Sequence, residues 1–442
     1  MNDTICAVST PAGVGGIAVV RVSGPEAIEV CNSIWRGKSL LETPGNIARV
    51  GSLLDTSGEA LDEAVALVFR APRSFTGEDT VELSVHGSRW IQRETIASLV
   101  KHGARIAEPG EFTRRAFASG RLDLAQAEAV ADMIAASSRA SARVALNQMR
   151  GSISDKLDEL RKKLVNLASL LELELDFGEE DVEFASREKL AEATGEITEE
   201  IRRLLTSFRS GAAIKDGIPV AIVGATNAGK SSLLNALTDD DRAIVSDIHG
   251  TTRDTIEETL EIGDYLFRLI DTAGLRETSD KIEQMGIERS RMAMSRAQIV
   301  LYVIDPTNFT ELDLSALPQD ADVLRIINKS DIYHDHAIDG IHISAKTGEG
   351  IESLRSILAD IAARKTNEGE DTVLITNARH AAALEAALGS AETLLNGLQT
   401  ALPSDLLAQD LRETLHHLST ITGKITTGEI LNNIFQNFCI GK

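Results

Sequence analysis

The chain has 442 residues, of which 43% are hydrophobic and 25% charged, a composition typical of a globular protein with two or three domains. No stretch approaches the roughly 20 apolar residues of a membrane-spanning helix, and the start MNDT lacks the basic residues of a secretory signal. The net charge of −22 disfavours nucleic-acid binding through bulk electrostatics, so contact with RNA would need a local basic patch or a partner. Three widely spaced cysteines, Cys6, Cys31 and Cys439, argue against a disulfide framework or a zinc site. We expect a cytoplasmic protein without a membrane segment.

Residues 1–118 are predicted to form an α+β domain, because short apolar runs alternate with Gly, Pro and Ser breaks. Residues 119–212 are predicted to be helical. Their leucines recur at spacings of three and four, which places on one helix face Leu157, Leu160, Leu164, Leu167 and Leu171.

Residues 213–366 alternate strand-like and helical runs, the pattern of a parallel sheet covered by helices. Residues 367–442 return to helical periodicity, and Ser404 is typical of a helix cap. The simplest fold is a multidomain α/β protein. In it a P-loop α/β domain of the Ras type is inserted into a discontinuous α-helical domain that follows the N-terminal domain.

A phosphate-binding loop is indicated where the apolar run 219–223 leads into GATNAGKS, residues 224–231. The glycines let successive backbone N–H groups face phosphates, Lys230 would neutralise the β and γ oxygens, and Ser231 would give its hydroxyl to Mg²⁺. The predicted nucleotide-binding residues of this loop are Asn227, Ala228, Gly229, Lys230, Ser231 and Ser232.

Two further motifs follow in the order expected for a GTPase. Asp271, at the end of a second apolar run, would hold Mg²⁺ through water, with Thr272 and Ala273 beside it, and the Gly274 amide would sense the γ-phosphate. Thr252 lies in the long stretch between, where a switch loop belongs, and would complete the Mg²⁺ shell.

Selection of the base is predicted from Asn328, Lys329 and Asp331, which follow another apolar run. The Asp331 carboxylate can accept from both N1–H and the exocyclic amine of guanine, a donor pair that adenine lacks. A backbone N–H for the guanine carbonyl would come from Ser344, Ala345 and Lys346. The five motifs together predict GTP as the ligand.

The residue that orients the attacking water is not evident from the chemistry. Many small GTPases use a glutamine after the DTAG glycine, but Leu275 stands here and cannot hydrogen-bond water. The following stretch, residues 276–283, offers several carboxylates among which the residues alone do not choose.

The whole chain resembles the MnmE (TrmE) family of bacterial tRNA modification GTPases. Besides the nucleotide motifs, the resemblance is carried by SFTGED at 74–79, PGEF at 109–112, LDLAQAEA at 122–129 and FCIGK at 438–442. It implies a homodimer that works with a FAD-dependent partner, MnmG (GidA), in a heterotetramer. Together they would install a carboxymethylaminomethyl or aminomethyl group on C5 of the wobble uridine, with the tRNA held mainly by the partner.

The resemblance also implies a folate, such as 5-formyl-tetrahydrofolate, as carrier of the one-carbon unit. The N-terminal domain would bind it and mediate dimerisation. The folate positions carried over are Arg21, Glu82, Arg121 and Lys442. At Arg121 the family more often has lysine, which keeps the charge but changes the geometry.

For hydrolysis the resemblance selects Glu283 as the water-orienting residue. It also implies a K⁺ site, where a monovalent cation would replace an arginine finger by neutralising charge that builds during transfer. Its residues would be Asn227 with the loop Ser246, Asp247, Ile248, His249, Gly250 and Thr251. His249 is unusual for the family and reads either as a solvated loop residue or as a source of pH sensitivity.

Cys439 has two readings. Gly441, Lys442 and the chain end would leave it accessible and electropositive, a setting that lowers a thiol pKa and suits a nucleophile. A small apolar residue beside the folate pocket explains it equally well.

Two other functions fit part of the sequence. A ribosome-assembly GTPase, acting as an RNA-binding switch, explains the nucleotide motifs but neither the N-terminal domain nor the CIGK end, and the acidic charge disfavours it. A folate-dependent transferase that GTP merely regulates is the third reading.

Overall fold

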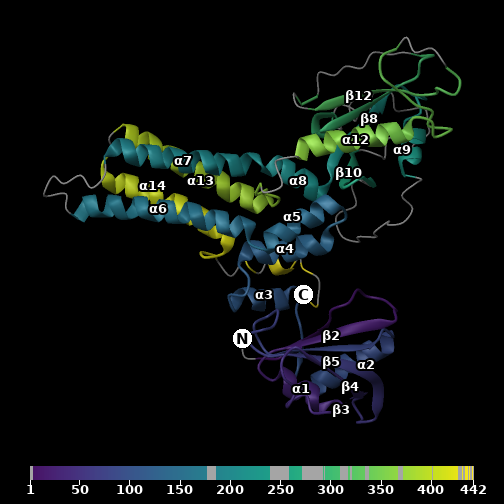
Figure 1. Ribbon diagram of the computed structural model, residues 1–442, viewed down its shortest axis with the longest axis vertical. Coiled ribbons are helices and arrows are strands. Elements are labelled where there is room, and N and C mark those ends of the chain that lie inside the picture. Colours follow the sequence, from purple (N-terminus) through teal and green to yellow (C-terminus); the bar gives the residue numbers. More distant parts are fainter. Residues whose placement is uncertain are drawn as a thin grey trace. The chain divides into compact units, whose positions relative to one another are not determined.

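The computed structural model describes residues 3–176, 186–238, 258–270, 292, 294–308, 317–318, 321–333, 338–366, 372–400, 402–426, 431, 434–436, 438 and 441. The chain divides into two compact units (elements labelled in Figure 1). The first unit comprises Met1–Ala131, Gln148–Arg161 and Leu415–Lys442, and the second comprises Asp132–Asn147 and Lys162–Thr414.

The first unit is built on a mixed sheet whose described strands have the order β3-β4-β5-β6-β2-β1-β7. β7 runs parallel to β1, and the other neighbours are antiparallel. The strands are β1 (Ile5–Val8), β2 (Ile17–Ser23), β3 (Trp35–Gly37), β4 (Ile47–Leu54), β5 (Ala60–Phe69), β6 (Thr80–His86) and β7 (Arg105–Ile106).

Two helices, α1 (Ala27–Ser33) and α2 (Arg89–Lys101), share a core with one face of this sheet. Along β2, Val20 and Val22 are buried in that core, so Arg21 between them points to the other face. The period of two along each strand therefore decides which side chains face away from α1 and α2.

On the other face, α3 (Glu111–Ala118) covers part of β1, since Ile5 and Ala7 pack against Phe112. The start of α4 (Leu124–Ala135) packs against the C-terminal segment through Leu124 and Phe435. At Gly110, where φ is 64°, an added Cβ would lie 2.5 Å from the carbonyl oxygen of Phe435, so the two segments approach closely.

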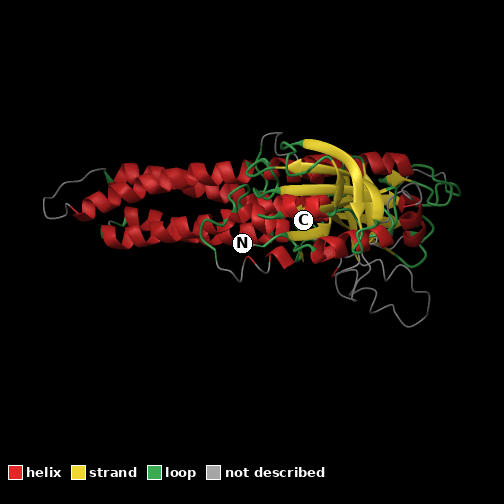
Figure 2. Cartoon of the chain, turned by 90° about the horizontal axis from the view of Figure 1, so that it is seen from below, coloured by secondary structure: helices red, strands yellow, loops and turns green. Residues whose placement is uncertain are grey.

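The helical part of the chain contains long helices that lie side by side (Figure 2), with most of their residues in the second unit and the rest in the first. The helices are α5 (Arg139–Met149), α6 (Ser152–Asp176), α7 (Arg187–Thr206), α8 (Phe208–Asp216), α13 (Ala378–Gln399) and α14 (Ser404–Thr422). Arg412 of α14 pairs with Glu172 of α6, and Arg187 at the start of α7 donates to Ser404. The predicted leucine face of α6 is buried, as expected for a helix inside a bundle.

The remaining part of the second unit is an α/β sheet with the described strand order β13-β12-β11-β8-β10-β9, parallel except for β9. Its strands are β8 (Ile218–Gly224), β9 (Glu258–Ile262), β10 (Tyr265–Ile270), β11 (Ile299–Ile304), β12 (Asp322–Ile327) and β13 (Ile341–His342). Helices α9 (Lys230–Thr238) and α12 (Ile351–Thr366) pack against it. Every residue of β11 is buried, which is why its sequence is a continuous apolar run.

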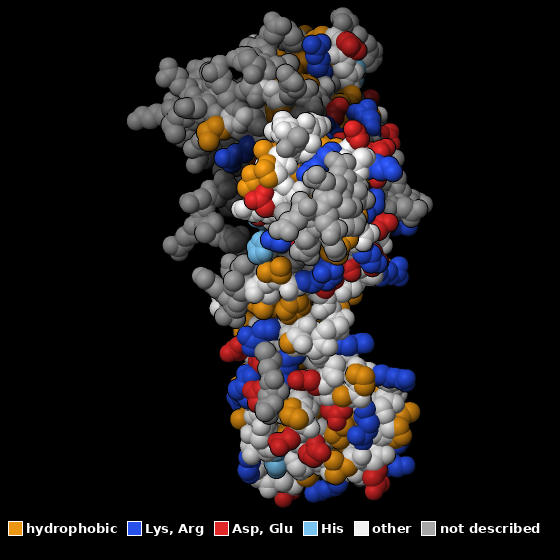
Figure 3. Space-filling model, turned by 90° about the vertical axis from the view of Figure 1, so that its left-hand side faces the viewer, with side chains coloured by type: hydrophobic (Ala, Val, Ile, Leu, Met, Phe, Trp, Pro, Cys, Tyr) orange, Lys and Arg blue, Asp and Glu red, His pale blue; other side chains and the backbone are white. Residues whose placement is uncertain are grey.

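These sheets and helices confirm a multidomain α/β protein, while the boundaries at 118, 212 and 366 and the insertion stay predictions. Among the described residues, no helix is long and apolar enough to span a bilayer. On the face shown in Figure 3, acidic and basic side chains are interspersed.

Candidate functional site

The phosphate loop, residues 224–231, connects β8 to the start of α9. Gly224 has φ 152°, and a Cβ there would lie 2.2 Å from the carbonyl oxygen of Val303 on the neighbouring strand, so glycine is required. Asn227 has φ 65°, the left-handed conformation, and is exposed at the turn of the loop. A strand, a turn with left-handed residues and a helix start together form an anion-binding geometry.

Lys230 begins α9 and bends back over this loop. Its Nζ donates hydrogen bonds to the carbonyl oxygens of Gly224 (2.9 Å) and Ala225 (2.8 Å). Burial lowers the pKa of the ammonium group, because its charged form loses hydration. A phosphate bound in the loop would offset that cost by supplying negative charge.

A magnesium ion fits the residues that follow. Ser231 and Ser232 are exposed in the first turn of α9, and a hydroxyl oxygen is a hard ligand of the kind Mg²⁺ prefers. The other predicted ligands and switch residues lie outside the described residues: Ser246, Asp247, Ile248, His249, Gly250, Thr251, Thr252, Asp271, Thr272, Ala273, Gly274 and Glu283.

Asn328 joins the phosphate loop to the predicted guanine site. Its side chain is buried, with Nδ2 donating to the carbonyl oxygen of Ala228 (2.9 Å) and Oδ1 accepting from the backbone N–H of Ala345 (3.0 Å). At Gly229, an added Cβ would lie 2.0 Å from Nδ2 of Asn328. One side chain thus fixes three loops from distant parts of the sequence.

Asp331 is oriented from the neighbouring loop. Its Oδ1 accepts a hydrogen bond of 2.7 Å from Oγ of Ser344, which is fully buried. The N–H of Ala345 is engaged by Asn328, and those of Ser344, Thr347 and Gly348 also donate within the described structure. The guanine carbonyl would therefore meet the N–H of the exposed Lys346 or share that of Ala345.

In the first unit, the structure brings Arg21 and Glu82 together. They lie opposite each other on β2 and β6, and the Arg21 guanidinium contacts Glu82 Oε1 at 2.8 and 2.9 Å. The guanidinium carbon also lies 5.4 Å from the ring centroid of Phe75 and 5.6 Å from that of Phe112. The pair is partly buried, with the two side chains 18% and 24% exposed, and its guanidinium lies close to two aromatic rings.

Of the other two predicted folate residues, only Arg121 is among the residues that the structure describes. Arg121 is exposed and lies beside the loop that carries Phe75, because a Cβ added at Gly77 would meet its Cγ at 3.2 Å. Lys442 and Cys439 lie outside the described residues. The carbonyl oxygen of Gly441 accepts a hydrogen bond of 3.1 Å from Oγ of Ser9, the residue that follows β1, so this part of the C-terminal segment lies at the end of that strand.

Sequence reasoning missed an ion network centred on Arg115, which is almost fully buried. Its guanidinium contacts Asp3 (2.8 Å), Glu111 (3.1 Å) and Glu78 (3.2 Å), the last of which lies in the loop that carries Phe75. Burial opposes ionisation of Glu111, but hydrogen bonds, chiefly from Arg105, outweigh it and lower its pKa. The only sequence signal was the helical spacing of four between Glu111 and Arg115.

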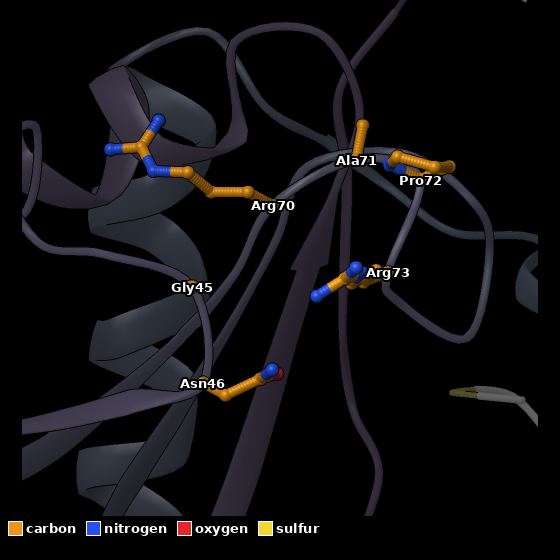
Figure 4. Close-up of a pocket in the computed structure, with 6 residues that line it drawn as sticks. All are labelled: Gly45, Asn46, Arg70, Ala71, Pro72 and Arg73. Atoms are coloured by element: carbon orange, nitrogen blue, oxygen red, sulfur yellow. The ribbon is translucent and has the colours of Figure 1, made fainter.

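A separate cavity of about 240 Å³ in the first unit is lined by Gly45, Asn46, Arg70, Ala71, Pro72 and Arg73 (Figure 4). The side chains of Asn46 and Arg73 extend toward the same space, whereas Arg70 is turned to the carbonyl oxygens of Leu41 and Thr43. None of the three described folate candidates, Arg21, Glu82 and Arg121, lines it.

A phosphate loop tied through one buried asparagine to a guanine-selecting loop, on a mainly parallel sheet, defines a P-loop GTPase. The comparisons place the chain within that class. The family model described as the MnmE helical domain matches residues 124–439, and that of the GTP-binding protein TrmE N-terminus matches residues 4–121. The chain belongs to the MnmE family.

Curated relatives match along their full length. A tRNA modification GTPase MnmE from Parabacteroides distasonis is 49% identical, with all of both chains covered. One from Cytophaga hutchinsonii is 47% identical over all of this chain and 98% of the relative. A solved complex of SsGBP with GDP is 20% identical over 47% of this chain and 69% of that one, and its TM-score of 0.24 is too low to support a statement on the fold.

Proposed function

We propose that this chain is a K⁺-activated GTPase that acts in tRNA modification with the FAD-dependent partner MnmG. Together they would add an aminomethyl or carboxymethylaminomethyl group to C5 of the wobble uridine, with the carbon taken from a tetrahydrofolate. The observation that carries this proposal is that one chain of the MnmE family contains both a nucleotide site and a second polar site that suits a folate. Asn328 links phosphate and guanine loops in the second unit, and Arg21 with Glu82 forms a partly buried ion pair close to two aromatic rings in the first.

In the proposed GTPase site, different motifs bind the phosphates, hold Mg²⁺ and orient the attacking water. Lys230 would neutralise the β and γ oxygens, while Ser231, with Thr252 and Asp271, would hold Mg²⁺ that offsets the charge on the phosphates. Leu275 cannot hydrogen-bond the attacking water, and the resemblance to the MnmE family selects Glu283 as the residue that would orient it. Glu283→Ala should therefore abolish most GTP hydrolysis while leaving GTP affinity near that of the wild type, the pattern of an interaction made in the transition state. Normal turnover in this variant would remove Glu283 from the site.

Potassium activation is proposed for the region around Asn227. This side chain is exposed at the left-handed turn of the phosphate loop, where its oxygen would reach a cation beside the phosphates. Hydrolysis should be fast in KCl and slow in matched NaCl, and Asn227→Ala should remove the difference while sparing Lys230. Equal rates for the wild type in the two salts would contradict the cation site.

Folate binding is proposed for the region around Arg21 and Glu82. A pteridine offers N–H groups to the Glu82 carboxylate, and a cation suits the glutamyl carboxylates, a role proposed also for Arg121 and Lys442. Arg21→Ala or Glu82→Ala should weaken binding of 5-formyl-tetrahydrofolate in calorimetry without altering GTP binding. Arg93→Ala is the matched control, because Arg93 is an exposed arginine of the same unit that pairs with Glu94. Unchanged folate affinity in both test variants would place the site elsewhere.

A homodimer is proposed through the first unit. On its sheet Val50 and Val65 are cross-strand partners, and their side chains are 77% and 38% exposed. Neighbouring apolar side chains that stay in water favour contact with a second copy. Val50→Asp should shift the mass measured by light scattering toward the monomer, and an unchanged mass would exclude this face.

The modification itself is tested in a strain that lacks this protein. Nucleoside mass spectrometry should show loss of the wobble-uridine group, restored by the wild type but not by Lys230→Ala. A full set of modified uridines in the deletion strain would refute the proposed function.

A further inference from the structure

Lys329, in the middle of the guanine loop (residues 328–331), is held by a carboxylate outside that loop. Its Nζ lies 2.5 Å from Oδ2 of Asp305, which directly follows β11. Lys329 has φ 69°, so its backbone adopts the left-handed conformation that costs energy in residues with a Cβ. A strained residue of this kind persists only where its surroundings fix it.

Asp305 is itself fixed in place. Its Oδ1 accepts hydrogen bonds from the backbone N–H (2.9 Å) and the hydroxyl (2.7 Å) of Thr307, which leaves Oδ2 directed at Lys329. The Asp305 side chain is only 9% exposed, so its charge requires a partner. Burial alone would raise the pKa of Asp305, but hydrogen bonds from Lys329 and Thr307 outweigh it and lower the pKa. The carboxylate is therefore ionised at neutral pH.

Asn328 and Asp331, which lie on either side of Lys329 in the loop, are held by other parts of the structure. Asn328 is bound to Ala228 and Ala345, and Asp331 accepts from Ser344. A left-handed residue between them reverses the backbone, so a change at Lys329 alters the orientation of Asn328 relative to Asp331. The backbone N–H of Ser330 also donates to the carbonyl oxygen of Ile343 (3.0 Å). The ion pair with Asp305 is thus the contact that fixes the Lys329 side chain within an anchored loop.

We propose that Asp305 is a positioning residue of the guanine site. By holding the Lys329 side chain, it keeps the guanine loop in its base-binding shape before the nucleotide arrives. Such preorganisation lowers the cost of binding and does not act on the transferred phosphoryl group. Its effect should therefore be equal for GTP and GDP, and should be found in affinity rather than in the rate of hydrolysis.

Asp305→Asn tests this proposal, because it keeps the size of the side chain and removes its charge. The Kd for GDP and for GTP, measured by calorimetry, should rise about tenfold, which corresponds to about 1.4 kcal/mol. KM should rise similarly, with kcat unchanged at saturating GTP. Asp322→Asn is the matched control: Asp322 pairs with Arg364 (3.0 Å) and Lys365 (2.8 Å) at the other end of β12, and its loss should leave Kd unchanged.

A double-mutant cycle separates positioning through Lys329 from a general structural effect. In a Lys329→Met background, Asp305→Asn should cause no further rise in Kd, because the partner is already gone. Additive losses, or an unchanged Kd in Asp305→Asn, would overturn the proposal. If Asp305→Asn fails to fold, Thr307→Val serves instead, since it removes one hydrogen bond that aims the carboxylate. A smaller rise in Kd is then expected, and no rise would overturn the proposal. A wild type that binds no GDP would refute the GTPase assignment itself.

Discussion

Gly229→Ala is the substitution whose consequence follows most directly from the structure. The added Cβ would lie 2.0 Å from Nδ2 of Asn328, where ordinary contact begins at 3.4 Å, so the amide has to move by about 3.4 − 2.0 = 1.4 Å. A shift of that size breaks the hydrogen bond from Asn328 to the Ala228 carbonyl and draws Oδ1 away from the Ala345 N–H. The phosphate and guanine loops would lose their shared anchor.

The magnitude is the sum of two effects. Two buried hydrogen bonds are lost, at about 1 kcal/mol each or more where a group stays unsatisfied. Gly229 also has φ 97°, and a Cβ there adds strain of about 1 to 2 kcal/mol. We expect the free energy of unfolding to fall by about 3 to 4 kcal/mol, a large part of the roughly 5 to 15 kcal/mol of a typical domain, together with weaker binding of GDP.

Urea unfolding and calorimetry with GDP measure both effects. Gly263→Ala is the matched control in the same α/β sheet region, because Gly263 also has positive φ (62°) but its nearest contact, Ala359, would lie 3.6 Å from the added Cβ. That variant should lose only the conformational part, about 1 kcal/mol, and bind GDP normally. If Gly229→Ala is no less stable than Gly263→Ala, or binds GDP as tightly, the reasoning about Asn328 is wrong.

Three further outcomes are expected. Asp331→Asn should shift preference from guanine toward xanthine nucleotides in competition binding, and unchanged GTP affinity would contradict the role of Asp331. Because burial lowers the pKa of Lys230 below 10.5, the unfolded chain holds that proton more tightly, so the unfolding free energy of the wild type relative to Lys230→Met should rise as pH rises from the folded pKa to 10.5. Glu111 gives a pH dependence of the same sign in a lower pH range: its pKa is lowered from 4.5, so its contribution is present above pH 4.5 and lost as pH falls through the folded pKa. The deficit of Glu111→Gln in urea unfolding should therefore be large at neutral pH and shrink in acid, and a constant deficit would exclude the ion network as its cause.

The local chemistry of the nucleotide site could be predicted from the sequence because it depends on residues that are close along the chain. GATNAGKS needs only a preceding strand and a following helix, and β8 and α9 supply them. The alternation of strand-like and helical runs over residues 213–366 likewise predicted a parallel sheet covered by helices, and the observed sheet is parallel except for β9. The resemblance to the MnmE family, confirmed by the comparisons, rested likewise on short motifs along the whole chain.

The contacts between distant segments could not be predicted in this way. Asn328 bonds to Ala228 a hundred residues earlier, and Arg21 meets Glu82 only because β2 and β6 pair in one register. A shift of that register by one residue would turn either side chain to the other face, and no local pattern reports it.

Asp305 shows the same division between sequence and tertiary structure. Along the chain it is one acidic residue among many after an apolar run. The fold makes it the partner of Lys329, because β11 and β12 run parallel and end at the same edge of the sheet. The sequence alone determined the class of protein and the nucleotide motifs, since local patterns suffice for them. Only the tertiary structure decided which side chains meet, because strand pairing brings together residues that the chain keeps far apart.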